Sequence, residues 1–389
     1  MRIAELSWSA ANGWSRRTAP VMRGGDGHAT KTDLILYFGM REALASGARF
    51  HELRAMFPDA HVVGCSTGGQ IHNDDVDDED ISVAALGFDA TTIRLACEPA
   101  LTPDQSRNCG AAIGKTLAAE DLAGIFVLSD GLNVNGSELV AGIIDVVGVR
   151  VPVTGGLAGD GAHFKETLVG ADCAPRDHMV AAIGFYGHAI RFGHGSAGGW
   201  DEFGPRRRIT RSVGNVLYEL DGSPALDLYE RYLGEAEAKG LPGTALLFPL
   251  RIYHQERPKH DLVRTILAVD RNARSMTFAG DMPEGWVAQL MRGNFDRLAA
   301  GAGDAARQAS VGIAKDSDGL AVMVSCIGRR LLMGQHTAEE VEAVGAEFGP
   351  RMSRIGFYSY GEISPHAASG VCELHNQTMT VTAITEASG

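Results

Sequence analysis

The stretch from residue 355 to residue 385 constrains the fold most, because it places polar side chains inside sequence typical of β-strands. Its flanks, IGFYSYGEI and VCELHNQTMTVTAIT, are rich in β-branched and aromatic residues, and SPHAASG between them favours a turn. We therefore predict a hairpin with a long loop. The residues from His375 to Thr378 are all polar, and since side chains alternate faces along a strand, both faces receive polar groups.

An unpaired buried amide or imidazole costs about 1–3 kcal/mol, so these polar groups need partners. Two interpretations are open: a hydrogen-bonded internal network, and the lining of a ligand cavity. The facing flank offers Tyr358, Tyr360 and Glu362, which suit either interpretation.

Charge and composition argue against several classes of protein. The net charge of −13 disfavours nucleic acid or an anionic membrane surface as a partner, because both select for clustered Lys and Arg. No apolar run reaches the ~18 residues needed to cross a bilayer, and the N-terminus lacks the apolar segment of a signal peptide. The six cysteines form no CxxC pair, so we expect free thiols. These observations predict a cytoplasmic protein with no membrane partner.

Two stretches show the order strand, helix, strand that is typical of a crossover between parallel strands. Their elements are Gly124–Leu128, Ser137–Val147 and a strand into Val153, and then Leu320–Ser325, Thr337–Phe348 and Ile355–Gly361. The repeated order predicts an α/β fold of two related lobes, with mixed β-sheets flanked by helices in a layered sandwich.

A turn at Asp221–Pro224 separates the two lobes in the sequence. A chain of 389 residues is long for one domain, so we expect domains at 28–223 and 224–389. In the second domain, Trp286 to Gln308 is predicted to form one long amphipathic helix.

Several motifs resemble catalytic or nucleotide-binding sequences without fitting them. Gly64–Gly68 matches the G-x-S-x-G nucleophile elbow, but an acidic loop follows where the elbow needs a helix. Cys109–Thr116 resembles the end of a P-loop, yet it lacks the first glycine and falls in a predicted helix. The glycines of Gly155–Gly161 do not match the dinucleotide fingerprint. No HxxxH pair occurs, so a metal site would need distant segments.

Glycine-rich segments end three predicted strands: Cys65–Gly69, Ser129–Gly136 and Thr154–Gly161. Ligands usually bind at strand ends in α/β sheets, and glycine lets backbone amides approach them, although tight turns alone also explain most of these glycines. We predict a small-molecule pocket formed by these ends and the polar C-terminal strands. The candidate ligand-binding residues are Cys65, Ser66, Thr67, Gly68, Asn135, Gly155, Gly156, Asp160, Cys326, Tyr360, Glu362, His375, Asn376 and Gln377.

Longer strings surround these candidates. They are VVGCSTGGQI, FVLSDGLNVNGSELVAGI, PVTGGLAGDGAHFKETLV, GNVLYELDGSPALDLYERYLG, and GFYSYGEISP with ELHNQTMTVTAIT. In this order they resemble the FIST family of bacterial signal-transduction proteins, over nearly the whole chain. The resemblance implies an N-terminal and a C-terminal FIST domain that form an intracellular sensory module for small ligands such as amino acids. The signal would pass to a separate partner, such as a histidine kinase or a cyclic-di-GMP enzyme.

The leading hypothesis is therefore a sensor without catalysis of its own. Some family members resemble nitric-oxide-sensing haemoproteins, for which His375, His194 or His178 would be the axial ligand; the absence of CxxCH means that haem would bind non-covalently. A second alternative is an enzyme with Cys65, Ser66 or Cys326 as nucleophile, His375 as base, and Glu362 or Asp160 orienting it. A third is a non-catalytic docking scaffold.

Overall fold

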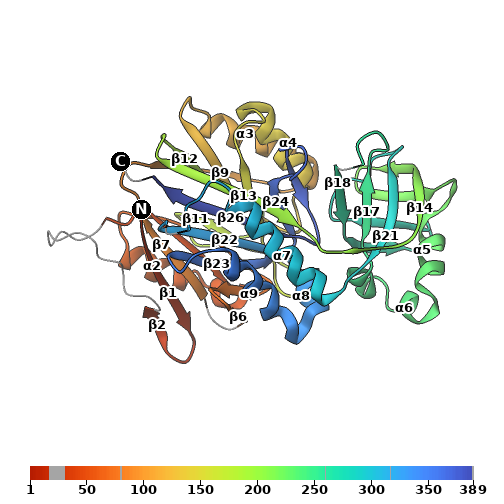
Figure 1. Ribbon diagram of the computed structural model, residues 1–389, viewed down its shortest axis with the longest axis horizontal. Helices are drawn as coiled ribbons and strands as arrows, with labels where there is room; N and C mark the ends of the chain where they lie inside the picture. Colours follow the sequence, from red (N-terminus) through yellow and green to blue (C-terminus); the bar gives the residue numbers. More distant parts are fainter. Residues whose placement is uncertain (17–30, 79–80, 259, 316, 388–389) are drawn as a thin grey trace.

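A computed structural model describes residues 1–16, 31–78, 81–258, 260–315 and 317–387. The start of the first predicted domain, residue 28, lies outside these ranges. The chain forms an α/β body and a smaller β-rich part, residues 201–292, which we call the β-unit; it forms the right-hand end of the molecule in Figure 1. None of the helices in the described ranges is long and apolar enough to cross a lipid bilayer.

Three six-stranded sheets make up the body. The first, in spatial order, is β11 (Val169–Ala171), β4 (His61–Ser66), β3 (Leu34–Gly39), β7 (Ile81–Gly87), β1 (Arg2–Ser9) and β2 (Gly13–Arg16). The second is β25 (Cys372–His375), β24 (Gly361–Pro365), β10 (Val153–Leu157), β9 (Leu122–Ser129), β12 (Met179–Tyr186) and β8 (Thr92–Pro99). The third is β13 (Ile190–Ala197), β26 (Met379–Glu386), β22 (Gly319–Cys326), β23 (Met352–Ser359), β5 (Gln70–His72) and β6 (Asp75–Asp77).

The three sheets share one apolar core. Phe38 of the first sheet, Phe126 of the second and Phe357 of the third all belong to it, and the rings of Phe38 and Phe357 lie 4.7 Å apart. Because these strands are buried on both faces, they read in the sequence as continuous apolar runs.

Helices cover the sheet faces that point away from this core. The helices of the body are α1 (Arg41–Leu44), α2 (Ala48–Met56), α3 (Ser106–Leu117), α4 (Gly136–Val147), α7 (Phe295–Ala309), α8 (Ile327–Met333) and α9 (Thr337–Glu347), with 3₁₀ turns η1 (Pro103–Gln105) and η3 (Gly334–His336). α3 and α4 approach closely because Gly110 and Gly142 lack a Cβ, which would come within 2.1 Å of a backbone oxygen of the other helix. The P-loop-like run Cys109–Thr116 thus lies within α3.

Both predicted crossovers are present. β9 and β10 are parallel and flank α4, and β22 and β23 are parallel and flank α9. Most other pairs are antiparallel, so the sheets are mixed, and the predicted α/β class is confirmed.

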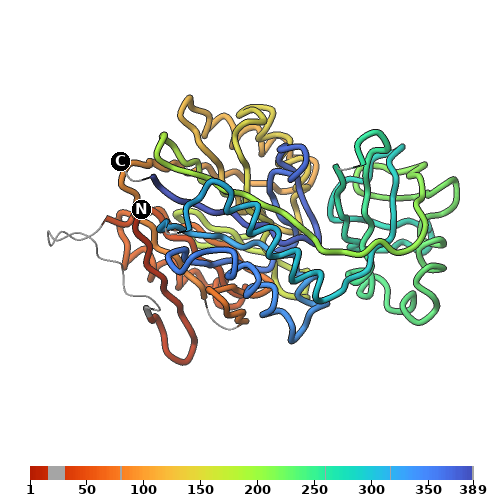
Figure 2. The backbone as a smooth tube through the Cα atoms, in the orientation of Figure 1, coloured from red at the N-terminus to blue at the C-terminus, as the bar shows by residue number. Residues whose placement is uncertain are grey.

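The β-unit contains an eight-stranded antiparallel sheet with a core of its own. Its elements are β14 (Asp201–Val213), β15 (Val216–Leu220), β16 (Ser223–Pro224), α5 (Ala225–Leu233), α6 (Glu235–Lys239), η2 (Gly243–Leu247), β17 (Leu250–Tyr253), β18 (Asp261–Arg264), β19 (Ile266–Asp270), β20 (Ser275–Phe278) and β21 (Val287–Arg292). The turn taken as the domain boundary lies here, at β16. The chain reaches the β-unit and returns by two neighbouring connections, since Asp201 pairs with Arg292 (Figure 2).

The single helix predicted for residues 286–308 is wrong in its first part. Val287–Arg292 forms β21, which pairs with β14 and β17, and α7 begins only at Phe295. Asn294 caps that helix by accepting a hydrogen bond from the amide of Arg297 at 3.2 Å. Tertiary pairing therefore overrides the helical periodicity of this segment.

The predicted C-terminal hairpin is also only partly right. β24 and β25 do pair, with Glu362 opposite His375. However, the flanking strands β23 and β26 belong to another sheet, so the chain changes sheets twice, at Tyr360 and again at residues 376–378. Gln377 has a φ of 60° at the second change. Asn376, Gln377 and Thr378 thus lie where regular pairing is interrupted, whereas His375 still pairs with Glu362 in β25.

Candidate functional site

A cavity of about 570 Å³, which we call the main cavity, lies between the body and the β-unit. From the body come the loop that follows β9, the end of β10, α8 and Tyr360, and from the β-unit come η2, β19 and β20. Its polar side chains are Asn135, Asn215 and the hydroxyl of Tyr360, and most of its remaining side chains are apolar. The size and the mostly apolar walls are those of a small-molecule site.

Exposed hydrophobic side chains gather at this cavity. Phe164 is 37% exposed, Leu267 45% and Leu331 44%, and all three line the cavity although they come from distant parts of the sequence. Exposed large apolar side chains that converge on one concave site indicate an apolar ligand or partner.

Tyr360 is held in place by Asp160. The Tyr360 hydroxyl donates to the Asp160 carboxylate, which also accepts hydrogen bonds from the amides of Phe164, Lys165 and Glu166 at 2.8–3.0 Å. Burial raises the pKa of Asp160, but these hydrogen bonds outweigh it and leave the pKa below its usual value. The ring of Tyr360 stacks on Phe164 with centroids 4.5 Å apart. This gives the cavity a rigid aromatic wall.

Asn135 links the cavity to the β-unit. Its side-chain oxygen caps α4 by accepting from the amides of Ser137 and Glu138 at 3.0 and 3.2 Å. Its amide nitrogen donates to the carboxylate of Asp281 in the β-unit at 3.2 Å. The residue therefore orders the loop after β9 and contacts both parts of the molecule.

Most candidates at the glycine-rich strand ends, unlike Asn135, do not line this cavity. Cys65, Ser66, Thr67, Gly68, Gly155 and Gly156 are buried in the sheets and are not among the residues that line it. Gly155 has a φ of 130°, and a Cβ there would lie 2.0 Å from the carbonyl oxygen of Val127. The sheet packing by itself explains this glycine.

Glu362 and Cys326 are buried where the C-terminal strands change sheets. The Glu362 carboxyl accepts from the Ser359 hydroxyl at 2.7 Å and from the amide and hydroxyl of Thr378 at 3.2 and 2.9 Å. Burial raises its pKa to about 8. Cys326 precedes α8, and burial raises the pKa of its thiol as well. Both groups are thus largely uncharged at neutral pH.

Only some of the polar side-chain atoms of His375, Asn376 and Gln377 have hydrogen-bond partners among the described residues. Nε2 of His375 hydrogen-bonds the carbonyl oxygen of Ser364 at 3.0 Å, and burial lowers the pKa of the imidazole to about 3. The amide nitrogen of Gln377 donates to the carbonyl oxygen of Leu246, a residue that lines the main cavity. Among the described residues, neither polar atom of the Asn376 side chain has a partner, and nor does the oxygen of Gln377.

The geometry does not assemble the nucleophilic site considered from the sequence. The hydrogen bond of His375 goes to Ser364, whereas Ser66 accepts from the amide of Leu168 at 2.8 Å. Cys65 and Cys326 are almost fully buried, and burial raises the pKa of both thiols. A buried neutral thiol without a base is a poor nucleophile.

Haem ligation does not fit the main cavity either. His375, His194 and His178 are all absent from its walls. Within the described ranges, no three His, Cys, Asp or Glu side chains are grouped to hold a metal ion.

Sequence reasoning missed the half of the cavity that the β-unit supplies. Asn215, Leu246, Ile266 and Phe278 belong to elements that read as ordinary strands and turns. The apolar side chains of Leu246, Ile266 and Phe278 give no local signal that distinguishes a cavity wall from a core, and Asn215 reads as a turn residue.

The fold and the cavity define a class: an α/β protein with a small-molecule-sized cavity against a β-rich part of the same chain. The FIST N domain matches residues 33–223 and the FIST C domain matches residues 225–365. The chain therefore belongs to the FIST family, whose domains are sensory signal-transduction domains.

Two further similarities were found. An uncharacterized protein of Methanocaldococcus jannaschii is 25% identical over 374 residues, covering 84% of this chain and 68% of that protein. A crystal structure of chorismatase aligns over 98% of both chains with 9% identity and a TM-score of 0.34.

Proposed function

We propose that this protein is a cytoplasmic sensory module that binds a small molecule in the main cavity and signals through a separate partner protein. The observation that carries the proposal is the cavity itself, about 570 Å³ in size, with walls contributed by both the body and the β-unit. The FIST domains supply the sensory class.

The walls favour an uncharged, largely apolar ligand with one or two hydrogen-bonding groups. Asn135 and Asn215 are the amide side chains that line the cavity, and Phe164 and Tyr360 offer ring faces for stacking. No Lys, Arg, Asp or Glu is among the described residues that line it, so a charged ligand would lose its hydration without gaining a counter-ion.

A ligand that touches both parts can change their relative arrangement. It shifts the population of arrangements only by the difference between its affinities for them. The body and the β-unit each supply about half of the wall. An arrangement that is closed around the ligand therefore makes more contacts with it, and has a higher affinity for it, than an open one. A partner protein that recognises one arrangement would then receive the signal.

The test uses N-phenyl-1-naphthylamine, an uncharged dye that fluoresces in apolar surroundings. We expect saturable binding to the wild-type protein and at least about tenfold weaker binding to Leu331→Glu, which places a charge at the cavity mouth. Val311→Glu is the matched control, because Val311 is 77% exposed and does not line the cavity. Equal binding by the two variants would show that the main cavity is not the site.

Mass spectrometry of co-purified molecules identifies the natural ligand and separates a sensor from a docking scaffold. A scaffold predicts no bound molecule and no thermal shift with any small-molecule panel. For the haem alternative, we expect no Soret band that depends on His375, since its Nε2 is hydrogen-bonded to Ser364. A band lost in His375→Ala would favour haem instead.

A further inference from the structure

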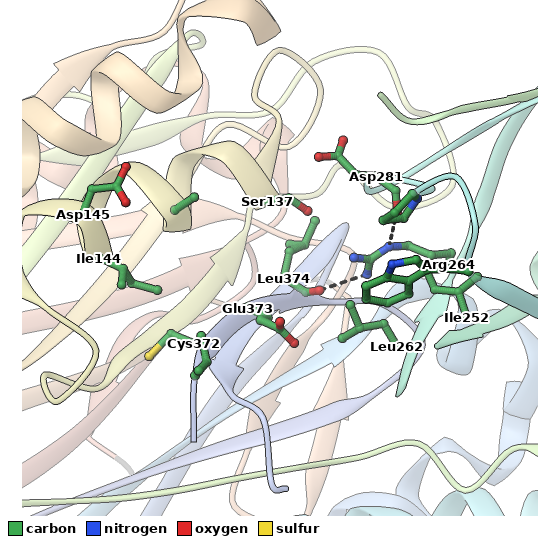
Figure 3. A pocket seen from close by; sticks show the side chains of 14 residues that line it. Ser137, Ile144, Asp145, Ile252, Leu262, Arg264, Asp281, Cys372, Glu373 and Leu374 are labelled. Atoms are coloured by element: carbon green, nitrogen blue, oxygen red, sulfur yellow. Dashed lines mark hydrogen bonds between the residues drawn. The ribbon is translucent and has the colours of Figure 1, made fainter. Parts of the chain in front are cut away.

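A second cavity, of about 340 Å³, is linked to the main cavity by the Asn135–Asp281 hydrogen bond, since Asn135 lines the main cavity and Asp281 lines the second. It is bordered by α4 and β25 of the body and by β17 and β18 of the β-unit (Figure 3). Its apolar walls include Ile144, Ile252, Leu262 and Trp286. We call it the Arg264 cavity, after the one arginine among the described residues that line it.

Arg264 is a buried cation without a counter-ion in contact. The residue is 4% exposed; its Nε donates to the carbonyl oxygen of Asp281 at 3.1 Å and its Nη1 to that of Leu374 at 3.0 Å. Within the described ranges it forms no ion pair, unlike the buried Arg329, which pairs with Glu340. Burial lowers the pKa of Arg264 to about 10, so it stays charged at neutral pH. Such a charge is costly unless an anion pairs with it.

The acidic side chains around the cavity are already engaged elsewhere. Glu373 pairs with His260 at 2.8 Å, and Asp145 pairs with Arg107 at 2.7 Å. Asp281 accepts from Asn135, and Figure 3 shows its carboxylate pointing away from the guanidinium. The nearby charges of Glu373 and Asp281 support the arginine only at a distance.

We infer that the Arg264 cavity is a second binding site, which takes an organic monocarboxylate with an apolar body. The guanidinium can hold a carboxylate through charge-assisted hydrogen bonds, and the surrounding aliphatic and aromatic walls accept the rest of the molecule. A volume of about 340 Å³ has room for a molecule of the size of a substituted benzoate. The wall of this cavity contains a guanidinium, whereas no Lys, Arg, Asp or Glu is among the described residues that line the main cavity, so the two cavities favour different ligands. The inference does not depend on the function proposed for the main cavity.

Fluorine NMR with 4-fluorobenzoate and its uncharged isostere 4-fluorobenzamide tests the inference. We expect saturable line broadening of the carboxylate and at least tenfold weaker binding of the amide to the wild-type protein. Arg264→Met should weaken the binding of 4-fluorobenzoate at least tenfold. Glu373→Gln removes a negative charge that repels the carboxylate of the ligand, so it should strengthen the binding several-fold. Arg251→Met is the matched control: Arg251 lies on the neighbouring β17, pairs with Glu202 and Asp261, and does not line the cavity.

Equal binding of acid and amide to the wild-type protein would overturn the inference, and so would equal losses in Arg264→Met and Arg251→Met. If Arg264→Met does not fold, the wild-type comparison and Arg264→Lys, which keeps the charge but loses the planar fork, still decide the question. The two sites can be tested separately. The Leu331→Glu variant should bind the naphthylamine dye weakly and 4-fluorobenzoate normally, whereas the Arg264→Met variant should bind the dye normally and 4-fluorobenzoate weakly.

Discussion

Replacing Glu362 by glutamine should stabilise the protein at pH 8.5 and leave it nearly unchanged at pH 5. The carboxyl is fully buried, and burial raises its pKa more than the charge of the buried Arg329, which is already paired with Glu340 at 2.7 Å, lowers it. Burial raises the Glu362 pKa from 4.5 to about 8, which corresponds to roughly 4–5 kcal/mol in favour of the protonated form. A glutamine can keep the contacts, with its oxygen accepting from Thr378 and its nitrogen donating to Ser359.

The sign follows from proton uptake. Between pH 4.5 and about 8 the native state retains a proton that the unfolded chain has released. The free energy of unfolding therefore falls as the pH rises through this range, and the contribution of this group becomes constant above about pH 8. Urea unfolding followed by circular dichroism at pH 5 and pH 8.5 measures the difference, with the exposed Glu235→Gln as control. If Glu362→Gln shifts stability equally at both pH values, the carboxyl is not held protonated and the reasoning fails.

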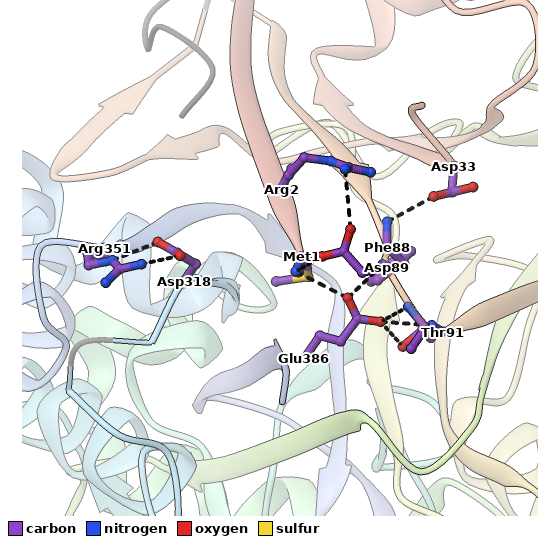
Figure 4. A network of polar contacts seen from close by, with 10 residues as sticks. Met1, Arg2, Asp33, Phe88, Asp89, Thr91, Asp318, Arg351 and Glu386 are labelled. Carbon is purple, nitrogen blue, oxygen red and sulfur yellow. Dashed lines mark hydrogen bonds and ion pairs between the residues drawn. The ribbon is translucent and has the colours of Figure 1, made fainter. Parts of the chain in front are cut away.

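Three other perturbations have defined outcomes. Asn376→Leu should raise the free energy of unfolding by about 1–3 kcal/mol in denaturant titrations, because both polar atoms of the buried amide lack partners among the described residues. A lower free energy of unfolding in this variant would mean that a bound molecule pairs with these atoms. Gly155→Ala should cost about 2–4 kcal/mol, since its Cβ would lie 2.0 Å from the Val127 oxygen, whereas Gly243→Ala, with no heavy atom within 4 Å, should lie within about 0.5 kcal/mol of wild type. Glu386→Gln should destabilise the protein at neutral pH, because the carboxylate accepts from the Asp89, Ala90 and Thr91 amides and pairs with the Met1 amine (Figure 4). Burial raises the Glu386 pKa, but these contacts bring it to about 2, so the deficit should shrink in thermal melts as pH falls from 4.5 towards 2, and a constant deficit would contradict this.

Local sequence patterns predicted the crossovers well and the C-terminal strands only in part. Strand, helix and strand in succession leave few alternatives to parallel pairing, as β9, α4 and β10 show. By contrast, β-propensity cannot tell that the chain leaves one sheet at Tyr360 and returns to it after Gln377, since sheet membership depends on packing against distant segments.

The same limit applies to the two cavities. Asn135 was a candidate because it lies in a glycine-rich strand end and Tyr360 because it lies in the polar C-terminal strands, and both line the main cavity. Arg264 gave no such signal, since one arginine in a short strand reads as a solvent-facing residue until its burial is known. Apolar residues such as Ile266 and Phe278 likewise read as core.

The way in which the β-unit is attached has a mechanical consequence. Because Asp201 and Arg292 are paired neighbours, the backbone enters and leaves the unit at one place, and contacts such as Asn135–Asp281 and Arg264–Leu374 hold the unit against the body elsewhere. Two backbone connections at one place form a pivot, so a molecule bound between the unit and the body would set the angle of the unit about that pivot. Spectroscopic distance measurements from α6 to two separate sites on the body would detect a rotation about that pivot, because one distance would shorten while the other lengthens.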